Sequence, residues 1–157
     1  MLPKLPAFTL PAPVATIVSR LPMWPLEQLL TRALDLGVGR VVSRDAVAPL
    51  VGRRFSLCVR DLGVTVRFEG TRDGFRPASP PHAPDLSITA TLRDYIALGL
   101  REEDPDTLFF ARRLAIEGDT DLGLTVKNLL DGIDWGAALR ALAESLPQPL
   151  RQLVSGR

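Results

Sequence analysis

Two short runs near the middle of the chain alternate between apolar and polar residues, and this alternation limits the fold more than any other feature. The runs are RFSLCV at 54–59 and VTVRF at 64–68, and Asp61, Leu62 and Gly63 connect them. Because successive side chains of a strand point to opposite faces, each run has one apolar and one polar face. The short connection predicts that the two strands form an antiparallel hairpin.

Two later segments repeat the alternation and add strands to the same sheet. They are DLSITA at 85–90 and RLAIEG at 113–118, and a turn at Asp73 and Gly74 separates the hairpin from the first of them. The pattern predicts four strands, with a fifth as the alternative. An antiparallel sheet with one apolar face needs helices over that face, so an α+β fold is expected.

The residues before the strands have helical periodicity. Pro25 stands at a position typical of the first turn of a helix, and apolar residues recur at helical spacing from there. The helix is predicted to end at Gly37 or Gly39, since glycine commonly follows a helix C-terminus. A short helical turn is expected at 43–48, so one amphipathic helix and one turn precede the sheet.

Two short helices are predicted between the strands at 85–90 and 113–118. Thr91 with Asp94 three residues later has the spacing of a capping box, and Asp104 before Pro105 combines an N-cap residue with proline in the first turn. Both pairs place a side-chain oxygen where the first backbone N–H groups of a helix need an acceptor. These acidic residues are therefore interpreted as helix caps.

The longest helix is predicted to follow the last strand, with Asp119 or Thr120 as its cap. Its apolar residues recur at helical spacing and form one stripe. A calcium-binding loop that begins at Asp119 is excluded, because its sixth position is Leu124 instead of glycine and its twelfth is Leu130 instead of glutamate. A final helix is expected at 137–146.

The composition argues against several classes of function. Lys and Arg number 19 and Asp and Glu 18, and these charges are spread along the chain, which makes nucleic acid an improbable partner. The single Cys58 excludes an internal disulfide, and the single His82 leaves neither a zinc cluster nor a base for a Ser or Cys nucleophile. Glycine-rich phosphate loops are absent as well. We therefore predict no metal, no cofactor and no catalytic residues.

The chain is predicted to consist of a Pro-rich apolar arm at 1–24, one domain at 25–146 and a tail at 147–157. Prolines interrupt the apolar runs of the arm too often for a signal peptide or a membrane span, so a cytoplasmic protein is expected. Two interpretations of the arm stay open. Its apolar side chains pack on the domain or on a second copy in a homodimer, or they make shallow contact with the inner membrane.

The run DPDTLFFARRLAIEGDTDLGLTVKNLLD, at 104–131, resembles the signature of the UbiT (YhbT-like) family of bacterial ubiquinone-biosynthesis accessory factors. Members of this family are built on the sterol carrier protein type two (SCP-2) domain. RRLAIEGDT and LTVKNLLD are similar to that family's late strand and helix almost residue for residue. The strong likeness covers 103–134, and a looser likeness in the order of the elements covers about 25–135.

This resemblance implies a fold and a function. The fold is a curved, mostly antiparallel five-stranded sheet covered by helices, which enclose an apolar tunnel for lipids. The lipids are prenylated quinone precursors or phospholipids, which the protein presents to hydroxylating enzymes. The implied partners are UbiU-like and UbiV-like proteins of the oxygen-independent route to ubiquinone. The family offers no catalytic residues to transfer, in agreement with the composition.

The expected tunnel lining combines the apolar face of the strands with the inner sides of the helices, and an ordinary filled core stays open as the alternative. The turn at 109–110 and the arm are expected near the entrance. The full set is Phe55, Leu57, Val59, Val64, Val66, Phe68, Leu108, Phe109, Phe110, Leu114, Ile116, Leu122, Val126, Leu129, Leu130 and Ile133.

Two other functions are kept as alternatives. A structural adaptor would have a filled core and would only hold partners together. A lipid-modifying enzyme would need a convergent acid–base set such as Asp119 with Glu117 or Asp121. Arg112 and Arg113 are interpreted as solvated surface charges, with contact to a lipid phosphate as the alternative.

Overall fold

The computed structural model describes residues 11–20, 22–41, 43–78, 83–132 and 144. The predicted helix at 137–146 and the 147–157 tail lie outside the described residues, apart from residue 144, so these two boundaries stay predictions. The elements follow one another as α1 (Ala12–Ser19), α2 (Trp24–Val41), α3 (Arg44–Val47), η1 (Ala48–Leu50), β1 (Arg54–Val59), β2 (Val64–Thr71), β3 (Gly74–Pro77), β4 (Leu86–Ala90), α4 (Leu92–Gly99), α5 (Pro105–Phe110), β5 (Ala115–Gly118) and α6 (Thr120–Gly132).

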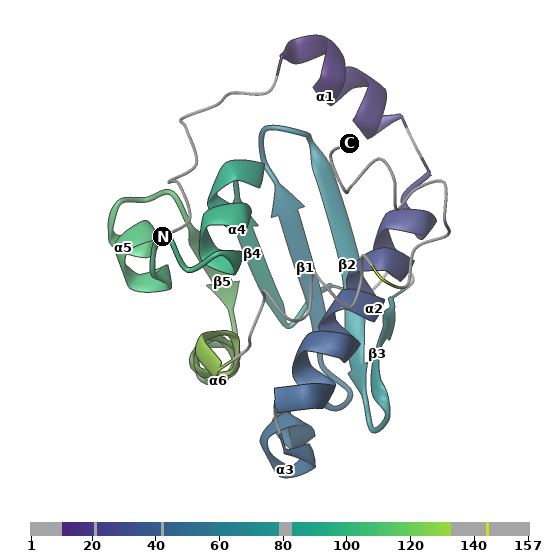
Figure 1. The fold of residues 1–157 in the computed structure, drawn as a ribbon, viewed down its shortest axis with the longest axis vertical. Helices are drawn as coiled ribbons and strands as arrows, with labels where there is room; N and C mark the ends of the chain where they lie inside the picture. Colours follow the sequence, from purple (N-terminus) through teal and green to yellow (C-terminus); the bar gives the residue numbers. More distant parts are fainter. Residues whose placement is uncertain (1–10, 21, 42, 79–82, 133–143, 145–157) are drawn as a thin grey trace.

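The five strands form one open sheet in the order β3-β2-β1-β4-β5 (Figure 1). The pairs β1–β2, β2–β3 and β4–β5 are antiparallel, and the central pair β1–β4 is parallel. The predicted hairpin at 54–68 is confirmed, and the fifth strand is β3, which follows the turn at Asp73 and Gly74. The predicted α+β fold with a five-stranded, mostly antiparallel sheet is therefore confirmed.

The register places the apolar residues of neighbouring strands in rows on the same face of the sheet. One row runs across β2, β1, β4 and β5 and consists of Val66, Leu57, Ile88 and Ile116. The opposite face is polar, and Glu69 there forms ion pairs with Arg54 and Arg76 of the adjacent strands. The alternation in the sequence therefore gives the sheet one apolar face and one polar face.

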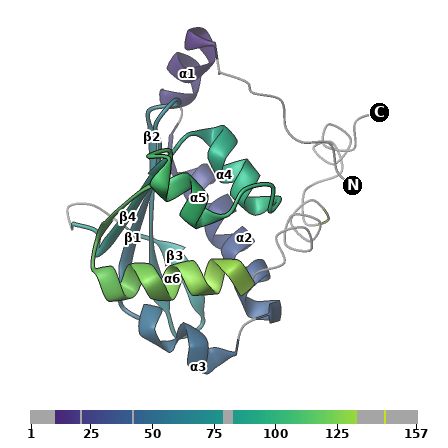
Figure 2. The same cartoon turned by 90° about the vertical axis from the view of Figure 1, so that its left-hand side faces the viewer.

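The helices α2, α4, α5 and α6 all lie on the apolar side of the sheet, and α1 lies beyond one end of it (Figures 1 and 2). Between the sheet and these helices is a core cluster of buried side chains. It consists of Leu34, Leu50, Phe55, Phe68, Leu86, Ile88, Ala90, Leu108, Leu114 and Leu122. Among the described helices, none has both the length and the apolar character that crossing a membrane requires.

The helix α2 differs from the prediction, because it continues through Gly37 and Gly39 to Val41. A glycine inside a helix costs only about 1 kcal/mol relative to alanine, and contacts with other elements can offset that cost. One such contact comes from Asp35, whose Oδ1 accepts a hydrogen bond of 2.7 Å from the backbone N–H of Phe75 in β3. Burial raises the pKa of the Asp35 carboxyl. The prolines of the arm do not prevent helix formation either, since Pro13 lies in the first turn of α1.

The junction between β5 and α6 explains the glycine and aspartate of the sequence EGDTDLG. Gly118 has φ of +121°, and a Cβ at this position would lie 2.2 Å from the carbonyl O of Asp85. Asp119 then caps α6, because its Oδ1 accepts a hydrogen bond of 3.0 Å from the N–H of Leu122. The chain thus turns from the sheet edge into the helix within two residues.

Candidate functional site

The helix-covered face of the sheet is the candidate functional site, because it brings together most of the predicted lining residues. Many of them are buried there. From the strands these are Phe55, Val64, Val66 and Phe68, from α5 and α6 Leu108 and Leu122, and from the connection before β5 Leu114. Phe55 and Phe68 stack with their ring centroids 5.2 Å apart. These side chains form the floor and the margins of the site.

The middle of this face is less covered than its margins. Leu57 and Val59 of the central strand β1 are partly exposed, although their neighbours in the register are buried. Those neighbours are Val66 and Val64 on one side and Ile88 and Ala90 on the other. The helix layer therefore leaves a strip of the central strand, defined by Leu57 and Val59, within reach of solvent. We call it the central strip.

Further partly buried apolar side chains pack against the core. Ile116 of β5 and Val126 and Leu129 of α6 were predicted from the sequence. Leu30, Tyr95 and Leu98, from α2 and α4, were not included in the predicted lining. Nor were the buried Leu86, Ile88 and Ala90 of β4, although the alternation of DLSITA placed them on the apolar face.

Not every predicted lining residue belongs to this site. Phe109 and Phe110 lie on the outside of α5 and are 48% and 81% exposed, respectively. The side chain of Leu130 and all of Ile133 lie outside what the structure describes. The lining role of the whole set therefore stays a prediction, and the structure groups only its strand residues, Leu108, Leu114 and the described inner side of α6.

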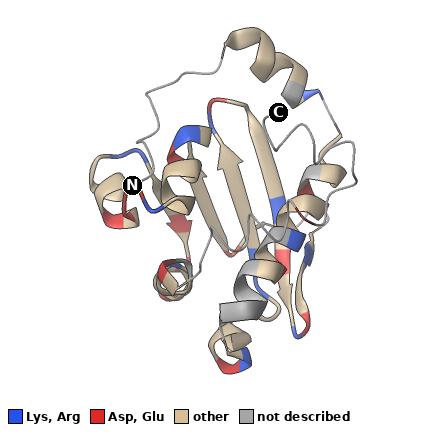
Figure 3. Cartoon of the chain, in the orientation of Figure 1, with Lys and Arg blue, Asp and Glu red and all other residues tan. Residues whose placement is uncertain are grey.

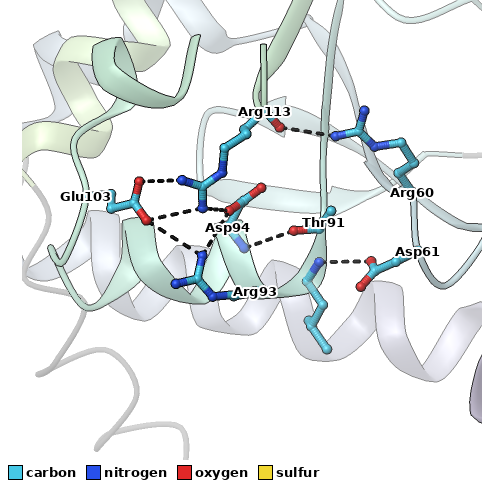
Figure 4. A network of polar contacts seen from close by, with 8 residues as sticks. Arg60, Asp61, Thr91, Arg93, Asp94, Glu103 and Arg113 are labelled. Atoms are coloured by element: carbon cyan, nitrogen blue, oxygen red, sulfur yellow. Dashed lines mark hydrogen bonds and ion pairs between the residues drawn. The ribbon is translucent and has the colours of Figure 1, made fainter. Parts of the chain in front are cut away.

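A polar network attaches α4 to the segment that follows α5 (Figure 4). Asp94 of α4 is buried and forms an ion pair with Arg113, which also pairs with Glu103 at 2.8 Å. Arg93 lies 3.7 Å from the Glu103 carboxylate. The hydrogen bonds to Asp94 and Glu103 raise the pKa of the Arg113 guanidinium. Arg113 is thus paired with two carboxylates instead of free in solvent, and these ion pairs connect the two elements.

Two further acidic residues, Asp104 and Asp106, are used in a helix cap and an ion pair. Asp104 accepts a hydrogen bond of 2.9 Å from the N–H of Thr107, and hydrogen bonds from the Thr107 side chain and backbone lower the pKa of Asp104. Asp106 binds Lys127 of α6 at 2.6 Å. Among the described residues, no group of three His, Cys, Asp or Glu side chains is placed to hold a metal ion. Acidic and basic residues are spread over the elements (Figure 3).

Tyr95 contributes a polar group that binds the backbone of β1 and β4. Its hydroxyl donates a hydrogen bond to the carbonyl O of Ile88 at 2.9 Å, shared with that of Cys58 at 3.1 Å. Burial is the main reason that the pKa of this phenol is raised above its ordinary value. The contact anchors α4 to the two central strands while the rest of the tyrosine side chain adds to the apolar surface.

Residues 30–131 match the model of the SCP-2 sterol transfer family, and this segment contains every element from the core of α2 to α6. The chain belongs to the SCP-2 sterol transfer family. A solved SCP-2 structure, titled "UbiJ-SCP2 Ubiquinone synthesis protein", supports the fold. It has a TM-score of 0.53 and 18% identity, and the alignment covers 70% of this chain and 97% of the other.

Within the SCP-2 family the chain is UbiT-like. It is 36% identical over 128 residues to the ubiquinone biosynthesis accessory factor UbiT of Escherichia coli strain K12, which covers 82% of this chain and 68% of the relative. The same protein from Escherichia coli O157:H7 matches equally. The predicted family resemblance is confirmed.

Proposed function

We propose that this protein is a non-catalytic lipid-binding accessory factor of ubiquinone biosynthesis. It binds a prenylated quinone precursor, or a phospholipid, against the apolar face of the sheet and presents the head group to hydroxylating partners. The single observation that carries the proposal is the central strip, an apolar surface that the helix layer leaves partly exposed in a UbiT-like SCP-2 domain.

The chemistry of the described site favours binding over catalysis. Asp94, Asp104 and Asp106 are engaged in ion pairs or helix caps, and Asp119 caps α6 and lies 3.6 Å from the Arg53 guanidinium. An acid–base catalyst needs a carboxylate that is close to the reacting group and available for proton transfer. The surface near the central strip offers aliphatic side chains and a tyrosine whose hydroxyl is already hydrogen-bonded to the backbone.

The physical need for such a factor follows from the hydrophobic effect. Exposing a polyprenyl tail to water costs about 0.8 kcal/mol for each methylene-sized unit, so a precursor of many carbons does not leave the bilayer unaided. An apolar protein site replaces one apolar environment with another. The net free energy of transfer then approaches zero, and both extraction and return are reversible.

The guest is proposed to lie along the central strip between α4 and α6. Leu57 and Val59 would form its floor, Leu98 of α4 one side, and Val126 and Leu129 of α6 the other. All five side chains are partly buried and therefore have contact surface left for a ligand. A lipid tail there would complete the layer between the sheet and the helices, as a buried side chain does elsewhere in the core.

Mass spectrometry of organic extracts from the purified protein tests this function directly. We expect a prenylated quinone precursor or a phospholipid in a ratio of about one molecule to one chain. Native mass spectrometry under gentle conditions should show the same mass increment on the intact protein. A protein that is free of lipid in both measurements, while it still supports the pathway, would instead be an adaptor with a filled core.

Two substitutions on α6 test where the lipid lies. The pair Val126→Asp and Leu129→Asp places two charges beside the central strip and is expected to abolish lipid copurification. Leu124→Asp on the same helix is the matched control, because Leu124 is 58% exposed and should have no effect on lipid content. Since the double variant risks unfolding, Leu57→Trp provides a second test, because it fills the strip with apolar atoms and should reduce lipid occupancy in a folded protein. Unchanged lipid content in folded Leu57→Trp would refute the placement.

The proposed partners are UbiU-like and UbiV-like proteins of an oxygen-independent route to ubiquinone. Affinity purification of the full chain from anaerobically grown cells should recover them, and deletion of the gene should stop ubiquinone synthesis only without oxygen. Replacement of Glu117, Asp119 and Asp121 by their amides tests the enzymatic alternative, and we expect these variants to retain pathway function. Loss of function in a folded amide variant that still binds lipid would favour an enzyme.

A further inference from the structure

The C-terminal end of α5 exposes four consecutive residues that we call the aromatic tip, Phe109 to Arg112. Phe110 is 81% exposed and Phe109 48%, and the two rings meet edge to face with centroids 5.8 Å apart. Ala111 and Arg112 are exposed as well. Contiguous exposed apolar patches commonly mark an interaction site. The two adjacent exposed phenylalanines therefore make the tip a candidate for one.

The aromatic tip is held firmly by the residues on either side of it. Leu108, the residue before it, is fully buried in the core, and Asp104 caps the start of the same helix. Arg113, the residue after it, is paired with the buried Asp94 and with Glu103. The exposure of the two phenylalanines is therefore a property of the fold and does not result from a loose helix end.

Two guanidinium groups accompany the aromatic tip. Arg112 is exposed and belongs to it, with a positive φ of 57° that directs the chain back toward Arg113. The exposed Arg60 donates a hydrogen bond of 3.3 Å to the carbonyl O of Arg113, the residue that follows the tip in the chain (Figure 4). Within the described part of the chain, neither arginine forms an ion pair. Asp106, an acidic residue of α5, forms an ion pair with Lys127.

We propose that the aromatic tip, together with Arg60, docks this protein on the surface of a bilayer that contains anionic lipids. Aromatic rings favour the interface between lipid head groups and tails, where they bury apolar surface. Exposed arginines beside them favour anionic phosphates and keep their charge in the head-group layer. The two arginines match the negative charge of such a bilayer, and the adjacent rings match its apolar interior. The proposal extends the proposed function to the site where a lipid would be loaded, but it does not require a lipid in the interior.

Sedimentation of the full-length protein with vesicles tests the docking. We expect the wild type to bind vesicles of phosphatidylcholine with phosphatidylglycerol and to bind phosphatidylcholine alone more weakly. The double variant Phe109→Ser and Phe110→Ser should lose at least about tenfold in affinity. Arg60→Gln and Arg112→Gln should each lose about fivefold on anionic vesicles, and added salt should remove that difference.

Matched controls come from the opposite end of the sheet. Val51 is 40% exposed before β1 and Arg72 is exposed in the β2–β3 turn, so Val51→Ser and Arg72→Gln change the same chemistry away from the tip. Both should bind vesicles as the wild type does. The tip variants and the controls should all keep the circular dichroism spectrum and the lipid content of the wild type. A loss of vesicle binding can then be told apart from a loss of lipid binding. Wild-type protein that binds neither kind of vesicle, or a folded tip variant that binds normally, would overturn the proposal.

Discussion

The helices α4 and α6 both cover the apolar face of the sheet, but different forces hold them there. In α4, polar groups fix the position, because Asp94 pairs with Arg113 and the Tyr95 hydroxyl binds strand carbonyls. In α6, apolar contacts dominate toward the sheet, and the helix comes close at Gly123, where a Cβ would lie 3.4 Å from Leu86 Cδ1. Its ion pair with Asp106, through Lys127, lies on the side of α5.

This difference indicates which side of the site can adapt to a guest. Hydrogen bonds and ion pairs have narrow distance and angle requirements, so they permit one position of α4. Apolar contacts have no direction, so α6 can shift slightly and exchange one apolar neighbour for another at a small cost in free energy. We infer that α4 provides a fixed wall and α6 an adjustable wall, and four measurements can test this contrast.

The largest effect is expected at the start of the adjustable wall. Gly118→Ala introduces a Cβ 2.2 Å from the Asp85 carbonyl O at a φ that other residues rarely adopt, and it should cost about 3 to 4 kcal/mol in the free energy of unfolding. Urea unfolding measures the change. Gly123→Ala is the control on α6, where the added methyl group makes ordinary contacts and should be tolerated. If Gly118→Ala were as stable as the wild type, the close approach would not exist.

A smaller loss is expected when the fixed wall loses its ion pair. Arg113→Met leaves the buried Asp94 carboxylate without its main partner and should cost about 2 kcal/mol. The estimate is reduced because the Arg113 side chain is 35% exposed and solvent screens part of the interaction. Adding Asp94→Asn should recover part of the loss, as thermal unfolding can show. Equal stability of Arg113→Met and wild type would mean that α4 is not held by this network.

The caps of the two helices form a matched pair of substitutions. Thr91→Ala removes the acceptor for the N–H of Asp94, and Asp119→Ala removes the acceptor for the N–H of Leu122. Each should cost about 1 kcal/mol. Hydrogen exchange should show faster opening of α6 in Asp119→Ala, whereas α4 in Thr91→Ala should stay protected by its other polar contacts. Equal loss of protection in both helices would contradict the contrast.

The smallest effect concerns pH and the helix α5 between the two walls. The pKa of Asp104 is lowered by the hydrogen bonds from Thr107, so this carboxylate stabilises the folded state above its ordinary pKa of about 4. That contribution is lost as the pH falls through the lowered value. Asp104→Asn keeps a cap but does not titrate, so the wild type should lose stability relative to this variant below about pH 4. Parallel pH profiles of the two proteins would argue against the role of this cap.

Much of the fold was predictable because it depends on local patterns. The alternation at 54–68 predicted the hairpin, and Thr91 and Asp104 were recognised as caps from their spacing to the helices that follow. For α6 the sequence left Asp119 and Thr120 as alternatives, and the structure shows Asp119. The predicted end of α2 was wrong. A glycine indicates where a helix can stop, but tertiary contacts decide where it does stop. The parallel pairing of β1 with β4 was not predicted either, because nothing local records which distant strand becomes a neighbour.

The candidate site was less predictable than the fold. The sequence shows that Leu57 and Phe110 are apolar, but only the packing shows that Leu57 lies on the central strand while Phe110 faces solvent. Arg112 and Arg113 are adjacent and chemically identical, yet one is exposed and the other pairs with a buried acid. Their difference arises from the backbone at φ of 57° and from α4, which is distant in sequence.

Tyr95 is the only tyrosine of this chain, so the phenolate absorbance band reports a single contact between α4 and the strands. Because the pKa of the folded phenol is raised, the folded state is favoured below the ordinary tyrosine value of about 10 and loses stability as the pH rises above it. In strong base, the phenolate band should therefore appear together with the loss of helical circular dichroism. The protein thus carries its own optical indicator of alkaline unfolding.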